Sequence, residues 1–344
     1  MKNLTLLFYI FLSWSSFSQE GGKHVFQFLD LDLNARSSAL GGDFIALRDD
    51  DISLALSNPA MIQESMHNNF AMNHFFMPAG INYGSLVYAR NFEDLGTFTG
   101  HLQYVNYGRF TRTDINGAEQ GNFTAGEYAL GVGYGKSLNK YFSIGGNFKT
   151  IFSHYETYTS VGVAGDLAIQ FYAEDQNLTA TLLTRNVGYQ IKGFTKGNRE
   201  PLPIEVLLGV SYKFHHAPFR LSIVATDLTE WDLTYSDPDA VATIDQLTGD
   251  TIPPETAGFA TKLFYHTNFG LEILPSENFH LRFGFNFQNR DALGVVGRKI
   301  FTGISMGFGV NVKKFRFDYG LNFRSSAGVS NVIGITTNFD AWRR

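Results

Sequence analysis

The segment from Leu281 to Phe323 alternates apolar residues with polar or small ones at a period of two. In the run 281–288 every odd position is Leu or Phe, and every even position is Arg, Gly, Asn or Gln. The runs 302–312 and 315–323 repeat the alternation. Successive side chains of a β-strand point to opposite sides. The segment therefore predicts three strands, each with one apolar and one polar face.

The same alternation marks fourteen strand candidates along the chain. They are 69–77, 80–90, 95–106, 126–137, 141–153, 160–173, 177–187, 203–214, 218–227, 262–274, 278–288, 301–313, 315–324 and 331–339. Most are nine to thirteen residues long, whereas the commonest strands of soluble proteins have about five or six residues. This length suits the roughly nine to eleven residues with which a tilted strand crosses a bilayer.

The connections between the candidates also differ in length. Short connections follow the fourth, sixth, eighth, tenth and twelfth candidates, and long ones follow the third, seventh, ninth and eleventh. The long ones are Tyr107–Ala125, Gly188–Leu202, Leu228–Thr261 and Asn289–Ile300. Short periplasmic turns that alternate with long outer loops are typical of barrels in the outer membrane. We therefore expect an all-β chain that forms a transmembrane antiparallel β-barrel of about fourteen strands.

Composition indicates which strand face meets water. The chain has 33 Phe and 16 Tyr, and only 17% of its residues are charged, against about 25% in soluble domains. Such aromatics suit a lipid-facing band, so we expect the apolar faces to point outward and the polar faces into the lumen. A net charge of -5 offers no basic surface for nucleic acid. The absence of cysteine excludes disulfides, thiolate metal sites and a cysteine nucleophile.

The N-terminal residues 1–18 have the features of a cleavable Sec-type signal peptide. Lys2 supplies a positive charge, Leu4–Leu12 an apolar run, and Ser16 and Ser18 the small residues of a cleavage site near Gln19. Residues 19–68 form a turn-rich segment with a short helix that opens at Asp51 or Ser53. The barrel is expected over 69–339, followed by a tail at 340–344.

Several charged residues fall on the predicted inner face of the strands, where water or a paired charge must solvate them. One interpretation is a lattice of salt bridges that braces the barrel and holds the N-terminal segment; the other is a role in selectivity. The residues are Glu127, Lys149, Asp166, Arg282, Arg316, Asp318 and Arg324.

No motif for catalysis or cofactor binding is evident in the sequence. The acidic triplet Asp49–Asp51 lacks the ligand spacing of an EF-hand, which favours a solvated turn beside a helix N-terminus over a calcium site. The glycine-rich run Gly131–Lys136 lacks phosphate-loop spacing and lies within a strand pattern. The histidines are scattered, which disfavours a metal site. We expect a protein that is not an enzyme and that needs neither a cofactor nor a metal.

Several segments resemble the FadL/PorV-like outer-membrane barrels. The N-terminal part of the sequences of that family is similar to three segments of this chain, namely Asn34–Gly42, the Asp49–Asp51 triplet and Asn58–Pro59–Ala60. Further segments resemble the PorQ-like members of that family, which serve type IX secretion: Ala79–Gly84, Gly197–Pro203, His216–Arg220 and Trp231–Leu233. The resemblance implies a fourteen-stranded barrel in the bacterial outer membrane, with residues 19–68 as an N-terminal hatch in or under it.

The resemblance also implies a role without catalysis. PorQ-like proteins are outer-membrane parts of the machinery that processes secreted cargo and attaches it to lipopolysaccharide. The implied partners are a PorZ-like surface protein, a PorU-like sortase and a PorV-like barrel, together with outer-membrane lipid or lipopolysaccharide. We expect the long outer connections to dock the surface partner, through Tyr107, Arg109, Arg112, Asp114, Arg199, Glu200, Trp231, Tyr235, Asp237 and Asp239.

A second hypothesis from the same resemblance is passive transport. A FadL-like barrel would carry a hydrophobic small molecule across the outer membrane. In that case we expect apolar hatch residues to line a pocket for the molecule, namely Phe26, Phe28, Phe44 and Ile45.

Overall fold

The computed structural model describes residues 24–175, 177–234, 243–244, 251–252, 257–292, 301–325 and 328–343. The expected signal peptide lies outside these residues. Fourteen long strands make up most of the described chain: β1 (Asn69–Phe76), β2 (Asn82–Phe92), β3 (Gly96–Thr113), β4 (Glu119–Ser137), β5 (Phe142–Tyr155), β6 (Tyr158–Tyr172), β7 (Leu178–Lys192), β8 (Glu205–Lys213), β9 (Phe219–Ala225), β12 (Thr267–Ser276), β13 (Phe279–Asn286), β14 (Ile304–Val312), β15 (Phe315–Ser325) and β16 (Gly328–Asn338).

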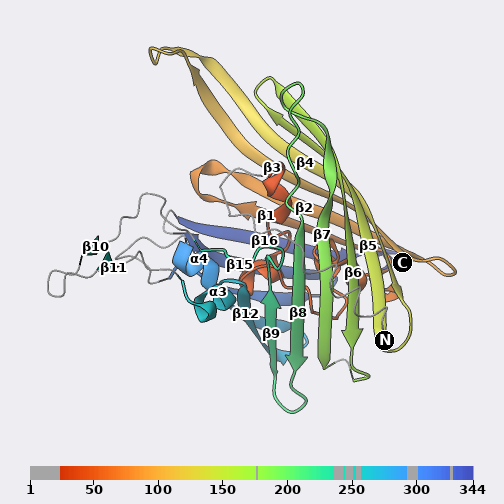
Figure 1. Cartoon of the computed structure of the whole chain (residues 1–344). Coiled ribbons are helices and arrows are strands. Elements are labelled where there is room, and N and C mark those ends of the chain that lie inside the picture. The colour runs from red at the N-terminus through yellow and green to blue at the C-terminus, as the bar shows by residue number, and fades with distance from the viewer. Residues whose placement is uncertain are drawn as a thin grey trace, which may run out of the picture.

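These strands form one closed antiparallel barrel (Figure 1). Each strand pairs with its neighbours in chain order, and β1 pairs with β16 from Asn69↔Asn338 to Phe76↔Asn331, which closes the ring. The short strands β10 (Thr243–Ile244) and β11 (Thr251–Ile252) pair with each other apart from the barrel. The predicted fold class and all fourteen predicted strands are confirmed. No helix in the described ranges is long and apolar enough to cross a membrane.

The inside and the outside of the wall differ as predicted. In β4 the side chains of Tyr128, Leu130 and Val132 are exposed on the outer face, whereas Glu127 and Ala129 are buried inside. In β13 Phe283 is 44% exposed and its neighbour Arg282 is fully buried. Apolar side chains thus cover the outside and polar ones the inside, the reverse of a soluble sandwich.

The prediction of a long connection over Tyr107–Ala125 is wrong, because most of these residues continue the two flanking strands. β3 and β4 run on together to a turn at 114–118, and Phe110 stacks on Phe123 across the hairpin. In Figure 1 this gold hairpin projects past the other strands. Residues 109–122 are exposed on both faces apart from the half-buried Asp114. The two faces of this part of the hairpin are therefore alike, and the sequence shows no alternation of apolar and polar residues that would predict a strand.

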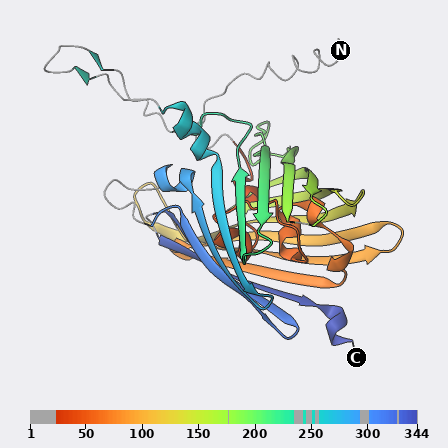
Figure 2. The same ribbon diagram turned by 90° about the horizontal axis from the view of Figure 1, so that it is seen from below.

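Helices replace predicted strand ends at two other connections. Residues 262–265, predicted as strand, belong to helix α3 (Phe259–Tyr265), and Phe287 begins helix α4 (Phe287–Ala292). The predicted alternation of connection lengths holds in part, because the connections after β7, β9 and β13 are long, as predicted. The turns after β2, β4, β6, β8, β12 and β14 are all short, whereas on the other side β5 and β6 are joined by just residues 156–157. Figure 2 places α3 and the C-terminus at opposite ends of the barrel.

Residues 24–68 fold inside the ring of strands and are called the hatch below. They contain α2 (Ala35–Ala39) and the short 3-10 helices η1 (Gln27–Asp30), η2 (Ile52–Leu56), η3 (Pro59–Met61) and η4 (Glu64–Met66). Apolar hatch side chains pack with inward-facing wall residues in three buried clusters, in which Phe28, Leu40 and Ile52 are each at most 3% exposed. This burial stabilises the closed position of the hatch.

Glycines on the inner face let the hatch backbone approach the wall. A Cβ atom on Gly284 would lie 2.0 Å from the carbonyl carbon of Leu40, and one on Gly145 would lie 2.1 Å from the carbonyl oxygen of Pro59. Both distances are far below van der Waals contact. Because only glycine leaves this space, these positions determine where the hatch can sit.

Candidate functional site

Polar side chains within the hatch cap its short helices. Asn34 accepts a hydrogen bond from the Ser37 backbone at 2.6 Å and begins α2. Asn58 accepts one from the Ala60 backbone at 2.9 Å and begins η3. These residues belong to the segments on which the family resemblance rests, and the geometry gives them a structural role.

The acidic triplet differs from its predicted solvated turn. Asp51 caps η2 as expected, accepting from the Ser53 backbone at 3.1 Å and from its hydroxyl at 2.6 Å, but its side chain is fully buried. Asp50 alone of the three is exposed. Asp49 and Asp51 need compensating positive charges, and the structure supplies them from the hatch and the wall.

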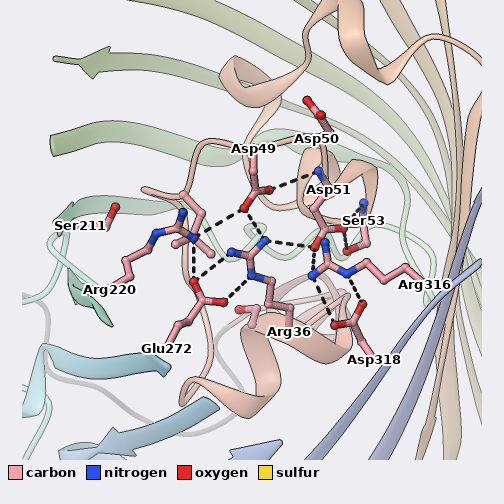
Figure 3. Close-up of polar contacts among 12 residues, drawn as sticks. Arg36, Asp49, Asp50, Asp51, Ser53, Ser211, Arg220, Glu272, Arg316 and Asp318 are labelled. Atoms are coloured by element: carbon pink, nitrogen blue, oxygen red, sulfur yellow. Dashed lines mark hydrogen bonds and ion pairs between the residues drawn. The ribbon is translucent and has the colours of Figure 1, made fainter. Parts of the chain in front are cut away.

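Arg36 of α2 is the centre of this compensation (Figure 3). Its Nε and Nη2 donate to the two carboxylate oxygens of Glu272 on β12 at 2.8 and 2.9 Å. Its Nη1 donates to Asp49 at 2.7 Å and to Asp51 at 3.3 Å. The side chains of Arg36 and Glu272 are 3% and 0% exposed. One guanidinium therefore joins two parts of the hatch to the barrel wall.

Wall residues extend the network around Glu272. Arg220 on β9 and Arg282 on β13 contact the Glu272 carboxylate at 2.7 and 3.1 Å. Arg282 also donates to Asp318 at 2.6 Å, and Arg316 contacts Asp318 at 2.8 Å and hatch residue Asp51 at 3.1 Å. We call the whole set the central cluster. Its members are Arg36, Asp49, Asp51, Arg220, Glu272, Arg282, Arg316 and Asp318.

The central cluster contains four arginines and four carboxylates, so its formal charges balance. Burial by itself would raise the pKa of Asp49, but the nearby Arg36, Arg220 and Arg316 hold that pKa well below its ordinary range. Burial acts to lower the pKa of Arg36, and the charges of Asp49 and Glu272 outweigh it and raise the pKa well above its ordinary value. The opposite charges of Arg36 and Asp49 thus favour the ionised form of each other inside the barrel.

The predicted lumen charges all lie on the inner face, in several separate groups. Arg282, Arg316 and Asp318 belong to the central cluster. Lys149 and Asp166 form an ion pair at 2.8 Å, and Glu127 accepts hydrogen bonds from Tyr107 and Ser153 at 2.6 and 3.0 Å. Arg324 lines a polar cavity nearer the long connections. Sequence reasoning missed Glu272 and Arg220, although each is an isolated charge among the apolar residues of its strand.

The residues proposed for docking lie on three separate connections at one end of the barrel. Arg109 and Arg112 are exposed on the β3–β4 hairpin, where Arg112 pairs with Glu156. Asp114 accepts from two backbone groups in the hairpin turn. Tyr107 differs from the expectation of a free docking side chain, since its hydroxyl donates inward to Glu127.

The other docking candidates follow β7 and β9. Arg199 is exposed, whereas Glu200 is half-buried and its backbone donates to Gln190 at 2.9 Å. Trp231 is 49% exposed and stacks on His266 at 5.4 Å between ring centroids. Tyr235, Asp237 and Asp239 lie outside the described residues. Sequence reasoning missed Phe259 of α3, which is 70% exposed beside Trp231.

The hatch residues expected to line a ligand pocket are packed instead. Phe26, Phe28, Phe44 and Ile45 are each at most 3% exposed and belong to the buried clusters. None of them lines the polar cavity beside Arg324 or the apolar recess on the outer face that is described next. They were expected at a binding surface because they are apolar, but the inner wall already covers their apolar surface.

An apolar recess of about 510 Å³ opens on the outer face of the wall. Its lining comes from strands β1 to β5 and includes Phe70, Leu130, Val132 and Phe148. It also reaches His101, an inward-facing side chain that is 6% exposed. The recess has the size and apolar character of a small-molecule site. Among the described residues, no group of three or more His, Cys, Asp or Glu side chains is placed to hold a metal ion.

Comparison with known proteins identifies the fold. No protein-family model and no curated protein sequence matches the chain. The toluene transporter TodX of Pseudomonas putida is similar in structure, with a TM-score of 0.52 at 14% sequence identity over 90% of this chain and 99% of TodX. The toluene transporter TbuX of Ralstonia pickettii has a TM-score of 0.54 at 10% identity over 91% of this chain and all of TbuX. The chain shares the architecture of these transporter barrels over nearly its whole length.

Proposed function

We propose that this protein is a FadL-like outer-membrane barrel that lets a hydrophobic small molecule pass when its hatch moves. The observation that carries the proposal is the closed fourteen-stranded barrel whose N-terminal hatch is buried inside it. A barrel with an apolar outer face is stable only when lipid surrounds it. No catalytic constellation accompanies this arrangement in the described residues, and the proposed activity is transport.

The comparisons support this choice of substrate class. The two similar structures are described as toluene transporters, and toluene is small, aromatic and apolar. The recess beside Phe70 and Phe148 offers an apolar surface for such a compound. The central cluster would then act as the latch, because moving the hatch separates Arg36 from Glu272.

A reversible lock of the hatch tests the proposal directly. The chain has no cysteine of its own, so introduced cysteines have no competing thiols. A Cβ atom on Gly334 of β16 would lie 3.2 Å from the Cβ of Ala35 in the hatch and 2.6 Å from Asn73 Oδ1, so the Asn73 side chain has to move aside. A disulfide needs about 3.5–4.5 Å between these atoms, so Ala35→Cys with Gly334→Cys should form one after a small shift.

We expect cells with the oxidised double variant to take up labelled toluene at the rate of a deletion strain. Reduction of the disulfide should restore the wild-type rate, and each single cysteine variant serves as the control. If the deletion strain takes up toluene and larger apolar compounds as fast as the parent, the transport proposal is wrong.

A second candidate function is an anchor in type IX secretion, as the PorQ-like segments imply. The observation that favours it is the β3–β4 hairpin, which extends beyond the wall and exposes Arg109, Ile115 and Glu119. A projecting hairpin offers a docking surface that a transporter does not need. The exposed Trp231 and Phe259 lie at the same end of the barrel.

Shortening the hairpin tests this candidate. A variant that joins Thr111 to Asn122, its partner across the β3–β4 hairpin, through a two-residue Asn-Gly turn keeps the barrel strands intact. We expect it to lose a PorZ-like surface protein from detergent extracts of the outer membrane, whereas the matched double variant Thr111→Ala and Asn122→Ala retains it. Retention by the shortened barrel, with normal cargo attachment, would count against the anchor.

A further inference from the structure

A polar cavity of about 180 Å³ lies between the hatch and the wall, at the end of the barrel that carries the long connections. We call it the loop-side chamber. Five carboxyl groups and two guanidinium groups line it, so its formal charge is -3 when all are ionised. These groups belong to Asp30, Asp32, Asp43, Glu205, Asp227, Arg185 and Arg324.

Within the part of the chain that the structure describes, Asp30 and Asp32 of the chamber form no ion pair. Arg185 is committed to Asp43 at 2.8 Å and Glu205 at 2.5 Å. Asp30 accepts from the Asn186 amide at 2.9 Å, and Asp32 from the Ser37 hydroxyl at 3.1 Å. These neutral donors hold the carboxyl groups in position but do not neutralise them. The central cluster, in contrast, has one positive charge for each negative one.

The hatch carboxyl groups of the chamber have raised pKa values. Burial is the largest cause that raises the pKa of Asp30 to about 7 and that of Asp32 to about 6; the charge of Asp43 adds to it, whereas Arg185 opposes it at Asp30 and Arg324 at Asp32. A cation in the chamber would reverse this effect and keep both groups ionised.

One wall residue that lines the chamber carries a buried, unpaired acceptor. Asn268 of β12 lines the chamber and is 1% exposed. Its Nδ2 donates to the Gly42 carbonyl at 3.3 Å, whereas its Oδ1 has no hydrogen-bond partner. An unpaired buried acceptor costs free energy, so this oxygen needs a donor from the chamber. The carboxylates favour a ligand with positive charge, and Asn268 Oδ1 favours one with N–H donors.

A primary ammonium group combines both properties, with three donors and one positive charge. A directly bound metal ion would need a convergent set of ligands, and the described residues contain no group of three acidic or histidine side chains placed for one. The cavity is also several times larger than the roughly 30 Å³ that one water occupies, which leaves space for a small organic molecule. Asp43 keeps 24% of its side chain exposed, so solvent reaches the chamber.

We propose that the loop-side chamber binds a small primary ammonium compound, whose nitrogen donates to Asn268 Oδ1 and to the carboxylates of Asp30 and Asp32. The site is independent of the transport proposed above. It would bind its ligand with the hatch closed, and the bound cation would stabilise that closed position by mass action.

Calorimetric titration of the full mature chain in detergent micelles tests the proposal, with ethylammonium chloride as the probe. We expect one site per chain. Tetramethylammonium chloride, which has the charge but no N–H donor, should bind at least tenfold more weakly. Sodium chloride at the same ionic strength controls for screening. Magnesium chloride tests a metal site.

Variants of Asn268 locate the site. Asn268→Leu should weaken ethylammonium binding at least tenfold, and Asn268→Asp, which adds a charge at the same volume, should tighten it. Asn147→Leu is the matched control, because Asn147 Oδ1 is also buried and unpaired but does not line the chamber. If Asn268→Leu does not fold, the affinity of Asn268→Asp for ethylammonium tests the location of the site.

Three results would overturn the proposal. They are no binding of ethylammonium up to 50 mM, equal binding of tetramethylammonium, and binding of magnesium without binding of ethylammonium. An unchanged affinity in Asn268→Asp would also place the ligand elsewhere.

Discussion

Arg36 of the hatch and Glu272 of the wall form a two-point ion pair at 2.8 and 2.9 Å, although 236 residues separate them in the chain. Both side chains are almost completely buried. Three arginines, Arg36, Arg220 and Arg282, share the Glu272 carboxylate. Removing this one negative charge would leave more positive charge in the lumen than the remaining carboxylates can balance.

We therefore expect Glu272→Gln to destabilise the folded barrel strongly. Breaking a buried ion pair by removing one partner costs about 3–5 kcal/mol, because the other charge stays buried. The free energy of unfolding can be measured by guanidinium titration in detergent micelles. Glu174→Gln is the matched control, because Glu174 pairs with Lys140 in an exposed turn and its loss should change stability little. Equal effects of the two substitutions would contradict the assigned role of Glu272.

The hatch should lose its closed position when a wall glycine gains a side chain. In Gly284→Ala the new Cβ would lie 2.0 Å from the backbone of Leu40, so the hatch has to shift or leave. We expect limited proteolysis to cut within residues 24–68 of this variant much faster than in the wild type. Gly100→Ala is the control, because its Cβ would meet nothing within 4 Å. Slow cleavage in both variants would mean that the hatch does not rest on Gly284.

Stability should fall as pH rises between about 4 and 7, through the hatch carboxyl groups of the loop-side chamber. Burial raises the pKa of Asp30 to about 7 and that of Asp32 to about 6, from an ordinary value of 3.8. In this window the folded chain holds more protons than the unfolded chain, so the contribution is complete below pH 4 and is lost above pH 7. Asp43, Asp227, Arg185, Lys149 and Arg324 are the charged groups that act on these two.

Thermal unfolding in micelles from pH 5 to 8 measures this dependence. Asp30→Asn and Asp32→Asn should each flatten the profile, because the amide stays neutral at every pH. The lowered pKa of Asp49 acts in the opposite direction and at lower pH, since its contribution is present above about pH 4 and is lost below it. A profile as steep in Asp30→Asn and Asp32→Asn as in the wild type would contradict the raised pKa values of these two groups.

We expect the exposed aromatic pair Trp231 and Phe259 to contribute to docking of a partner and not to the stability of the barrel. Trp231 and Phe259 are 49% and 70% exposed, with ring centroids 5.4 Å apart. We expect Trp231→Ala to leave the free energy of unfolding, measured by guanidinium titration, within about 0.5 kcal/mol of wild type, as surface substitutions usually do. A loss of more than about 2 kcal/mol would show that the pair supports the barrel itself.

Local pattern sufficed for the wall of this protein. In the strands of Leu281–Phe323, each Phe indicates the outer face and each intervening Arg, Gly or Asn the inner face. The inside and the outside could therefore be predicted from neighbouring residues. The pattern failed where a strand has no unlike faces, as in the β3–β4 hairpin beyond the wall. It also failed at Phe287, whose apolar side chain suits the end of a strand and the start of α4 equally well.

The sequence by itself determined the strands, their polarity and the presence of charges in the lumen. Only the tertiary structure decided which charges meet, because an ion pair such as Arg36 with Glu272 depends on barrel closure and on the position of the hatch. The local sequence predicts Asp51 as a helix cap, but it does not predict that Asp51 is buried and paired whereas its neighbour Asp50 is exposed. The loop-side chamber has the same origin, since Asp30, Asn268 and Arg324 become neighbours only when the ring of strands surrounds residues 24–68.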